Sequence, residues 1–223
     1  MSEHTWILDP SSGGLVVEGL SVEEASALAG DLLPTARELN CARPPLVAEL
    51  PPPAATNRCG LNLRVASIYH GSVIEGPGRR SVVQLQGCPI RCAGCVVPET
   101  HDPAGGVPLS IGHIVQTVLD RVGEPRDGVT VLGGEPFAQP RGLFALLRAL
   151  KARRVHTTVY SGYTLAALTR RLEPEVREAL RLTDLLIDGP YVAGLSDGAG
   201  EWRGSRNQRL VVHPTVSDSC KTR

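Results

Sequence analysis

From about residue 60 onward, short apolar runs alternate with longer amphipathic stretches. The runs are rich in Val, Leu, Ile and Thr and predict strands at residues 64–69, 81–86, 129–132, 157–160, 185–188 and 209–213. The amphipathic stretches have helical spacing and predict helices at residues 111–122, 141–152, 165–171 and 173–181. Strands that alternate with helices in this way predict an α/β fold with a mostly parallel sheet.

Two of the predicted helices have further sequence signals. Ser110 is a natural N-cap for the helix that starts at residue 111. Leu143, Leu146, Leu147 and Leu150 recur at helical spacing, so we expect them to face the sheet. Glycine-rich turns follow several of the predicted strands, and α/β proteins place their ligand sites at such strand ends.

The first 58 residues lack the alternation of strands and helices that the rest of the chain shows. Residues 5–20 favour a short strand or hairpin around LVVEGL. Ser21 and Glu24 form a capping-box pattern that opens a helix over residues 22–40, which Pro34 ends or kinks. A proline-rich stretch follows and has the character of an extended linker. We therefore expect an N-terminal extension over residues 1–58 and a core domain over residues 59–223.

Composition narrows the class of protein. Hydrophobic residues make up 42% and charged residues 21% of the chain, which excludes a disordered, collagen-like or coiled-coil protein. No apolar run is long enough for a membrane span, and the N-terminus lacks the pattern of a secretory signal, so we expect a cytoplasmic protein. Lys plus Arg and Asp plus Glu both number 23, which argues against a general nucleic-acid binder.

The cysteines carry the clearest chemical signal. Three of the six are scattered (Cys41, Cys59 and Cys220), and three form a C-x3-C-x2-C cluster at Cys88, Cys92 and Cys95. Clustered thiols in a cytosolic chain indicate metal binding rather than disulfides. Thiolates are the usual ligands of iron–sulfur clusters. Three of them on one loop suit a four-iron cluster whose fourth iron stays open to a substrate.

A structural zinc site is the alternative at this loop. Zinc needs four protein ligands in a closed tetrahedron, so Cys59, His70 or His101 would have to supply the fourth. Zinc-binding cysteine pairs usually occur twice, and the sequence holds no second pair.

The chain resembles the radical S-adenosylmethionine (SAM) enzymes, whose signature is this three-cysteine loop. Further segments in the same order resemble the activating enzymes of glycyl-radical proteins, in particular of anaerobic ribonucleotide reductases. These segments are EGPGRR at residues 75–80, LGGEPFAQ at 132–139, VYSGYTLAAL from 159, DLLIDGPY at 184–191 and WRGSRNQR at 202–209. The resemblance covers about residues 61–213.

The resemblance implies a fold and a set of site residues. The fold is an incomplete (β/α) barrel, open on one side. The cysteines Cys88, Cys92 and Cys95 would hold a [4Fe-4S] cluster. Residues Gly133, Gly134 and Glu135 would meet the SAM amino group, and Ser161 and Asp188 would approach the SAM carboxylate or a nearby cation. Taken without the resemblance, residues 133–135 also fit an ordinary turn before Pro136, and Asp188 fits a turn before Gly189.

The implied reaction is reductive cleavage of SAM followed by hydrogen abstraction from a glycine of a partner enzyme, a class III ribonucleotide reductase-like protein. A flavodoxin or ferredoxin would deliver the electron, and neither membrane nor nucleic acid takes part. We expect Arg79, Arg203 and Arg206 at or near the face that docks the partner.

Two other functions stay open. One is a radical SAM enzyme that acts on a small molecule or a peptide in biosynthesis. The other is a non-enzymatic iron–sulfur or zinc protein that serves as a binding or electron-transfer module. The Gly-Gly-Glu motif at residues 133–135 argues against the second, because an electron carrier has no need for it.

Overall fold

The computed structural model describes residues 5–8, 15–18, 61–119 and 127–214. Contacts between Cα atoms divide the chain into two units, Met1–Pro45 and Leu46–Arg223. In the first unit, β1 (Thr5–Leu8) and β2 (Leu15–Glu18) pair antiparallel, which confirms the hairpin predicted there. The predicted helix over residues 22–40 and the proline-rich linker lie outside the described residues, so the domain boundary near residue 59 stays a prediction.

The second unit contains a seven-stranded sheet in the order β5-β3-β4-β6-β7-β8-β9. The four central strands, β4, β6, β7 and β8, are parallel; β5 runs in the same direction, while β3 and β9 are antiparallel to their neighbours. The sheet has two edges, β5 and β9, and is therefore not closed, as the expected incomplete barrel requires. Its strands are β3 (Asn62–Ser72), β4 (Arg80–Leu85), β5 (Val107–Ser110), β6 (Gly128–Gly133), β7 (Thr157–Ser161), β8 (Leu185–Asp188) and β9 (Arg209–Val212).

All six strands predicted for the core domain are present, and β5 is an addition. The β5 strand has only four residues, and Pro108 pairs with Arg64 in the middle of it. Proline cannot donate to a neighbouring strand, so it is found on edge strands. The same proline makes such a segment look like a loop in the sequence, and for this reason β5 was not predicted.

The four predicted helices are present as α3 (Ile111–Leu119), α4 (Pro140–Lys151), α5 (Leu165–Thr169) and α6 (Pro174–Arg181). Short 3₁₀ helices occur at Pro98–Thr100, Pro136–Ala138 and Ala193–Leu195. The hydroxyl of Ser110 accepts a hydrogen bond of 3.2 Å from His113 N, which confirms Ser110 as the cap of α3. Among the described residues, no helix has the length and apolarity to cross a membrane.

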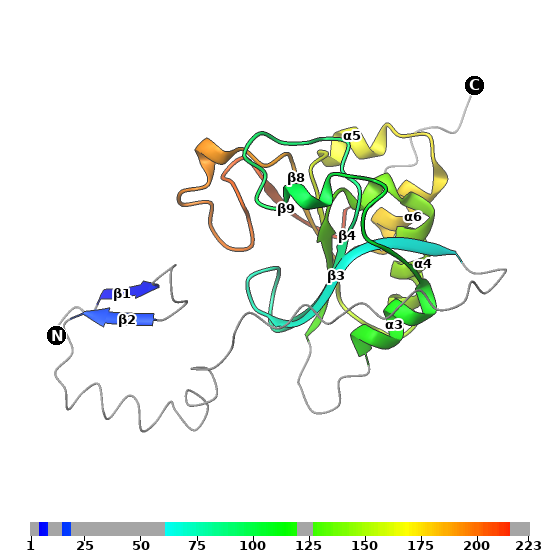
Figure 1. The fold of residues 1–223 in the computed structure, drawn as a ribbon, viewed down its shortest axis with the longest axis horizontal. Coiled ribbons are helices and arrows are strands. Elements are labelled where there is room, and N and C mark those ends of the chain that lie inside the picture. The colour runs from blue at the N-terminus through cyan, green and yellow to red at the C-terminus, as the bar shows by residue number, and fades with distance from the viewer. Residues whose placement is uncertain (1–4, 9–14, 19–60, 120–126, 215–223) are drawn as a thin grey trace. The chain divides into compact units, whose positions relative to one another are not determined.

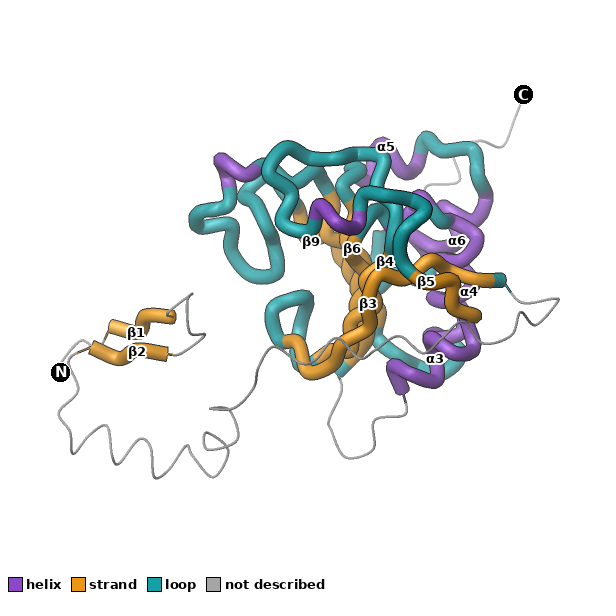
Figure 2. The backbone as a smooth tube through the Cα atoms, in the orientation of Figure 1, coloured by secondary structure: helices purple, strands orange, loops and turns teal. Residues whose placement is uncertain are grey.

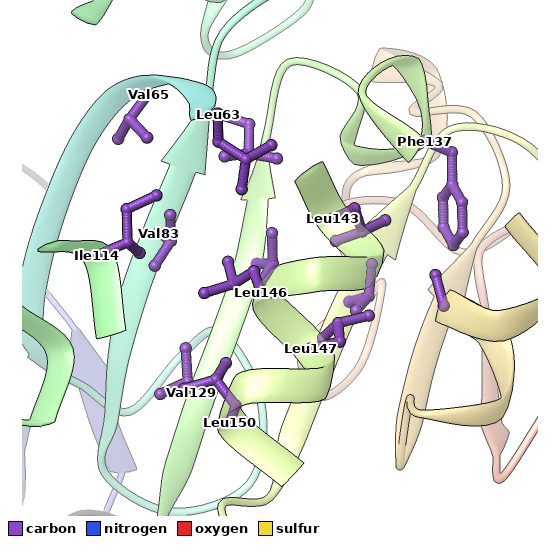
Figure 3. Close-up of a cluster of buried hydrophobic side chains, with 14 of the residues drawn as sticks. Leu63, Val65, Val83, Ile114, Val129, Phe137, Leu143, Leu146, Leu147 and Leu150 are labelled. Carbon is purple, nitrogen blue, oxygen red and sulfur yellow. The ribbon is translucent and has the colours of Figure 1, made fainter. Parts of the chain in front are cut away.

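One face of the sheet is covered by α3, α4 and α6 (Figures 1 and 2). The four leucines of α4 are fully buried, and Figure 3 shows Leu146 and Leu150 on the side of Val83 of β4 and Val129 of β6. The core therefore lies between the sheet and its helices, as the helical spacing of Leu143, Leu146, Leu147 and Leu150 predicted.

The opposite face of the sheet is open to a cavity. Successive strand residues point to opposite faces, so Val131 and Val159 enter the core, while their neighbours Leu132 and Tyr160 line the cavity. Two loops also project to this side, between β3 and β4 and between β8 and β9, away from α3, α4 and α6 (Figure 1).

A buried arginine holds the β3–β4 loop in place. The Arg80 side chain is fully buried, and its guanidinium donates to Thr130 Oγ1 (2.6 Å), Pro77 O (2.9 Å) and Val129 O (2.8 Å). Burial lowers the pKa of Arg80 to about 10, so it stays charged at neutral pH. Thr130 in turn donates to Glu75 O at 2.5 Å. The loop is thus fixed against the sheet by long-range hydrogen bonds.

We expect Arg80→Met to lower the free energy of unfolding by more than about 3 kcal/mol, because it leaves several buried carbonyl and hydroxyl oxygens without donors. Urea denaturation followed by circular dichroism measures this. The matched control is Arg79→Met at the neighbouring exposed position, which should change stability by less than about 0.5 kcal/mol. Equal unfolding midpoints for the two variants would contradict this role of Arg80.

Candidate functional site

The carboxyl ends of β4, β6 and β7 open into a cavity of about 760 Å³. Parallel strands place their loops together at this end, so residues far apart in sequence meet there. Of the predicted site residues, the cavity is lined by Cys88, Cys92, Cys95, Gly133, Gly134, Glu135 and Ser161.

The three cysteines lie on a loop that closes on itself. Gly87 N donates to Thr100 O at 2.8 Å, and Cys88 N donates to His101 O at 3.2 Å. The loop leaves the end of β4 and returns to the same place, which holds all three thiols on one side of the cavity. The thiols are half-buried and free of disulfides. Thiols in that state are available as metal ligands.

Two glutamines that the sequence analysis did not single out fix this loop to the sheet. Gln86 donates through Nε2 to Glu99 O (3.0 Å) and Asp102 O (2.8 Å). Gln139 donates through Nε2 to the carbonyl oxygens of Gln86 and Arg64, both at 3.0 Å. Because these bonds join residues distant in sequence, no local pattern signals them.

The Gly-Gly-Glu segment lies directly against the start of the cysteine loop. Gly134 N donates to Leu85 O and Glu135 N donates to Gly87 O, both at 2.8 Å. A Cβ atom on Gly134 would lie 2.4 Å from Gly87 O, and Gly133 has a φ of +96°. Both glycines are therefore required, the first for its backbone conformation and the second for the close approach of two backbones.

The Glu135 carboxylate is fully buried at the cavity wall. Its Oε1 accepts hydrogen bonds from Phe137 N (2.9 Å) and Ser161 Oγ (3.0 Å), and its Oε2 accepts one from Gly162 N (2.8 Å). Burial raises the pKa of Glu135 to about 7, although these hydrogen bonds and the nearby Arg171 oppose the rise. The carboxylate is thus oriented by the chain and titrates near neutral pH.

The two other predicted SAM contacts lie in different surroundings. Ser161 is buried and reaches the site through its hydrogen bond to Glu135. Asp188 is buried outside the cavity lining, where it accepts from Leu165 N at 2.5 Å and from Arg209 Nε at 2.9 Å. Those bonds connect β8 to the start of α5 and to β9. A direct contact of Asp188 with SAM stays a prediction.

A second carboxylate enters the cavity from the β3–β4 loop. Glu75 accepts a hydrogen bond of 2.8 Å from Tyr69 Oη, and Ser72 Oγ donates to its other oxygen. Burial raises the pKa of Glu75, while the bond from Tyr69 opposes the rise. In the sequence, residues 75–79 look like a turn whose position before the cysteine loop suggests the mouth of the site, and the structure brings Glu75 to the cavity.

The arginines expected at a docking face lie in three settings. Arg203 is half-buried and lines the cavity. Arg206 is exposed on the same β8–β9 loop, and Arg79 is exposed on the β3–β4 loop. Tyr160 Oη donates to Trp202 O at 2.6 Å, which ties the β8–β9 loop to the sheet.

The donor set fits an iron–sulfur cluster better than a single zinc ion. Each iron of a cluster takes one thiolate, so three thiols along one cavity wall meet its needs. A zinc site requires four ligands around one ion. In the part of the chain that the structure describes, no three His, Cys, Asp or Glu side chains are grouped around one point, and this includes the three thiols and His101 of the same cavity. His70 Nδ1 lies 2.9 Å from Ser81 Oγ in a hydrogen bond.

The chain is similar in sequence to known proteins. The 4Fe-4S single cluster domain family matches residues 74–211, more than half of the chain. The anaerobic ribonucleoside-triphosphate reductase-activating protein of Pasteurella multocida is 32% identical over 149 residues, which cover 63% of this chain and 91% of that protein. The pyruvate formate-lyase-activating enzyme of Clostridium pasteurianum is 34% identical over 131 residues, which cover 56% of this chain and 50% of that protein. The crystal structure of QueE from Escherichia coli aligns with 46% of this chain and 53% of its own, with 21% identity and a TM-score of 0.40.

Proposed function

We propose that the chain activates a glycyl-radical enzyme similar to anaerobic ribonucleotide reductase. The premise is that the chain belongs to the 4Fe-4S single cluster domain family and to the radical SAM activating enzymes. One observation carries the proposal. Three free thiols and one buried carboxylate line a single cavity, and the two loops that bear them are hydrogen-bonded to each other.

We assign the cofactors to residues of this cavity. Cys88, Cys92 and Cys95 would hold a [4Fe-4S] cluster, and SAM would lie beside the Gly-Gly-Glu segment. When bound, the two groups supply one-electron cleavage of a sulfonium S–C bond and removal of one hydrogen atom from the substrate glycine. The chain binds and orients these groups and keeps water from the reacting atoms.

The residues around SAM have distinct tasks in this proposal. Glu135 would accept hydrogen bonds from the SAM amino group. Ser161 and Gly162 would hold the Glu135 carboxylate in position through their hydrogen bonds to it. Gly133 and Gly134 would allow the ligand to lie close to the backbone. Asp188 would act as a positioning residue, since its bonds to Leu165 and Arg209 support the strand end next to the cavity.

The mouth of the cavity supports a protein as substrate. Three apolar side chains that line it are largely exposed: Val73 is 60%, Ile74 73% and Val96 75% accessible. Exposed apolar groups around a cavity are typical of a surface that binds another protein. The occupant we propose is the glycine-bearing loop of the partner, with Arg79, Arg203 and Arg206 contacting its acidic groups.

The electron donor and the compartment complete the proposal. A flavodoxin or a ferredoxin would deliver the electron to the cluster. We place the reaction in the cytoplasm, because free clustered thiols persist in a reducing compartment.

The test is transfer of a labelled hydrogen atom. With a partner enzyme deuterated at its glycine, reduced enzyme and SAM should yield 5′-deoxyadenosine that contains deuterium. With the unlabelled partner, the same mixture should give a doublet EPR signal on the partner. Association should weaken as salt rises, because the proposed contacts are between charged side chains. The Cys88→Ala variant is the control and should transfer no deuterium.

A radical SAM enzyme that acts in biosynthesis would take the deuterium from a different substrate. If the deuterium in 5′-deoxyadenosine comes from a small metabolite or a short peptide instead, the enzyme acts in biosynthesis and the activase proposal is wrong. The assignments of the cluster and of SAM would survive that result.

A further inference from the structure

His101 lines the candidate site and has an unpaired side-chain nitrogen. Its Nε2 atom is buried and has no hydrogen-bond partner among the described residues, although the residue lines the cavity with the three cysteines. A buried donor or acceptor that lacks a partner costs about 1–3 kcal/mol. Such a cost is offset when a bound group supplies the missing hydrogen bond.

The backbone fixes His101 next to the first cysteine. His101 follows the 3₁₀ helix Pro98–Thr100, and its N–H donates to Pro98 O at 3.1 Å. Its carbonyl oxygen accepts from Cys88 N at 3.2 Å. The imidazole therefore belongs to the same closed loop as the thiols and keeps its position relative to them.

Other polar groups of the cavity wall already have partners within the chain. Glu135, Glu75, Tyr69 and Tyr160 all form hydrogen bonds to protein atoms. Arg203 also has an unpaired buried nitrogen, but it lies on the β8–β9 loop and not on the loop that carries the thiols. Of the groups assigned to the cavity, the cluster is the one held by the loop that also carries His101.

We propose that His101 Nε2–H donates a hydrogen bond to a sulfur atom of the cluster and raises its reduction potential. This inference rests on the proposed function, since it requires the cluster at Cys88, Cys92 and Cys95. Hydrogen bonds to cluster sulfurs stabilise the more negative, reduced state. His101 is in this sense a positioning and tuning residue, and no proton is transferred.

Redox titration of the anaerobically reconstituted full chain tests the inference. The fraction of reduced cluster is followed by visible absorbance and EPR against potential. We expect His101→Phe and His101→Leu, which lack the donor, to make reduction about tenfold less favourable, equal to about 59 mV for one electron. His101→Gln, which keeps an N–H donor, should restore most of the potential. The control is His113→Phe on α3, outside the cavity lining, and it should leave the potential unchanged.

The outcomes distinguish failure of the His101 hydrogen bond from failure of the proposed function. An unchanged potential in His101→Phe and His101→Leu, with full iron content, overturns the hydrogen bond to the cluster and leaves the proposed function intact. An unchanged potential with weakened SAM binding assigns the imidazole to SAM instead and also overturns it. If the wild-type protein holds no four-iron cluster, the proposed function itself fails. Loss of iron in the two donor-less variants, with iron retained in His101→Gln, supports the hydrogen bond.

Discussion

We expect alanine at Cys88, Cys92 or Cys95 to abolish the iron–sulfur cluster. Anaerobically reconstituted wild-type protein should be brown and carry about four irons per chain, with one thiolate on each of three irons. Each variant loses one ligand of a set in which no spare thiol lines the cavity within the described residues. Iron analysis and the visible absorption spectrum measure the loss.

The scattered cysteines provide the matched controls. Cys41→Ala, Cys59→Ala and Cys220→Ala should keep their iron, because those positions lie outside the three-cysteine motif. Stoichiometric zinc without iron–sulfur absorbance, in protein purified without oxygen, would falsify the cluster assignment and favour the zinc alternative.

The second large effect is expected at Glu135. Glu135→Ala should weaken SAM binding about 10- to 100-fold, because a charged hydrogen bond contributes about 1.5–3 kcal/mol. Its iron content should stay at the wild-type level, since Glu135 is assigned to SAM and not to the cluster. The measurement is titration of the reduced cluster with SAM, followed by the change in its EPR signal. Loss of iron and fold in this variant would instead assign Glu135 a structural role.

The pH dependence of SAM binding follows from the same carboxylate. Only the ionised form of Glu135 pairs with the SAM amino group as a charged partner, and burial raises its pKa to about 7. Affinity should therefore fall by about tenfold per pH unit below this pKa, as one proton is taken up. A Glu135→Gln variant should bind weakly and show no such dependence between pH 5 and about 7. A wild-type transition near the ordinary carboxylate pKa would contradict the assignment.

The same shift affects the stability of the protein without SAM. The folded pKa of Glu135 lies near 7 and the ordinary value is 4.5, so between these values the unfolded chain is ionised while the folded chain keeps its proton. Rising pH therefore favours unfolding over this window, by up to about 3 kcal/mol. Bound SAM should oppose the loss, because it pairs with the ionised form.

Much of the fold could be predicted because it depends on local patterns. Short apolar runs located six strands of the core sheet, and helical spacing located its four helices and the buried face of α4. The C-x3-C-x2-C loop and the Gly-Gly-Glu segment were found for the same reason, since each is contiguous in sequence. The structure brings them to one cavity, as the topology of parallel strands requires.

The contacts that sequence reasoning could not supply join distant residues. Glu75 enters the cavity because Arg80 and Thr130 hold its loop, through bonds that span up to 55 positions. The β5 strand forms because β3 offers it an edge, despite Pro108. Asp188 is predicted as a site residue from its place at a strand end, and its hydrogen bonds to Leu165 N and Arg209 could not be read from the sequence.

The contact between Gly87 and the Gly134–Glu135 backbone also has a thermodynamic consequence. The segment assigned to SAM donates one backbone hydrogen bond to Gly87 O of the cysteine loop and one to Leu85 O at the end of β4, and Gly134 leaves no space for a side chain against Gly87. A change in one loop therefore cannot leave the other unaffected. If cluster assembly increases the affinity for SAM by some factor, SAM must increase the affinity for the cluster by the same factor at equilibrium. Retention of the cluster and retention of SAM would then depend on the same coupling free energy.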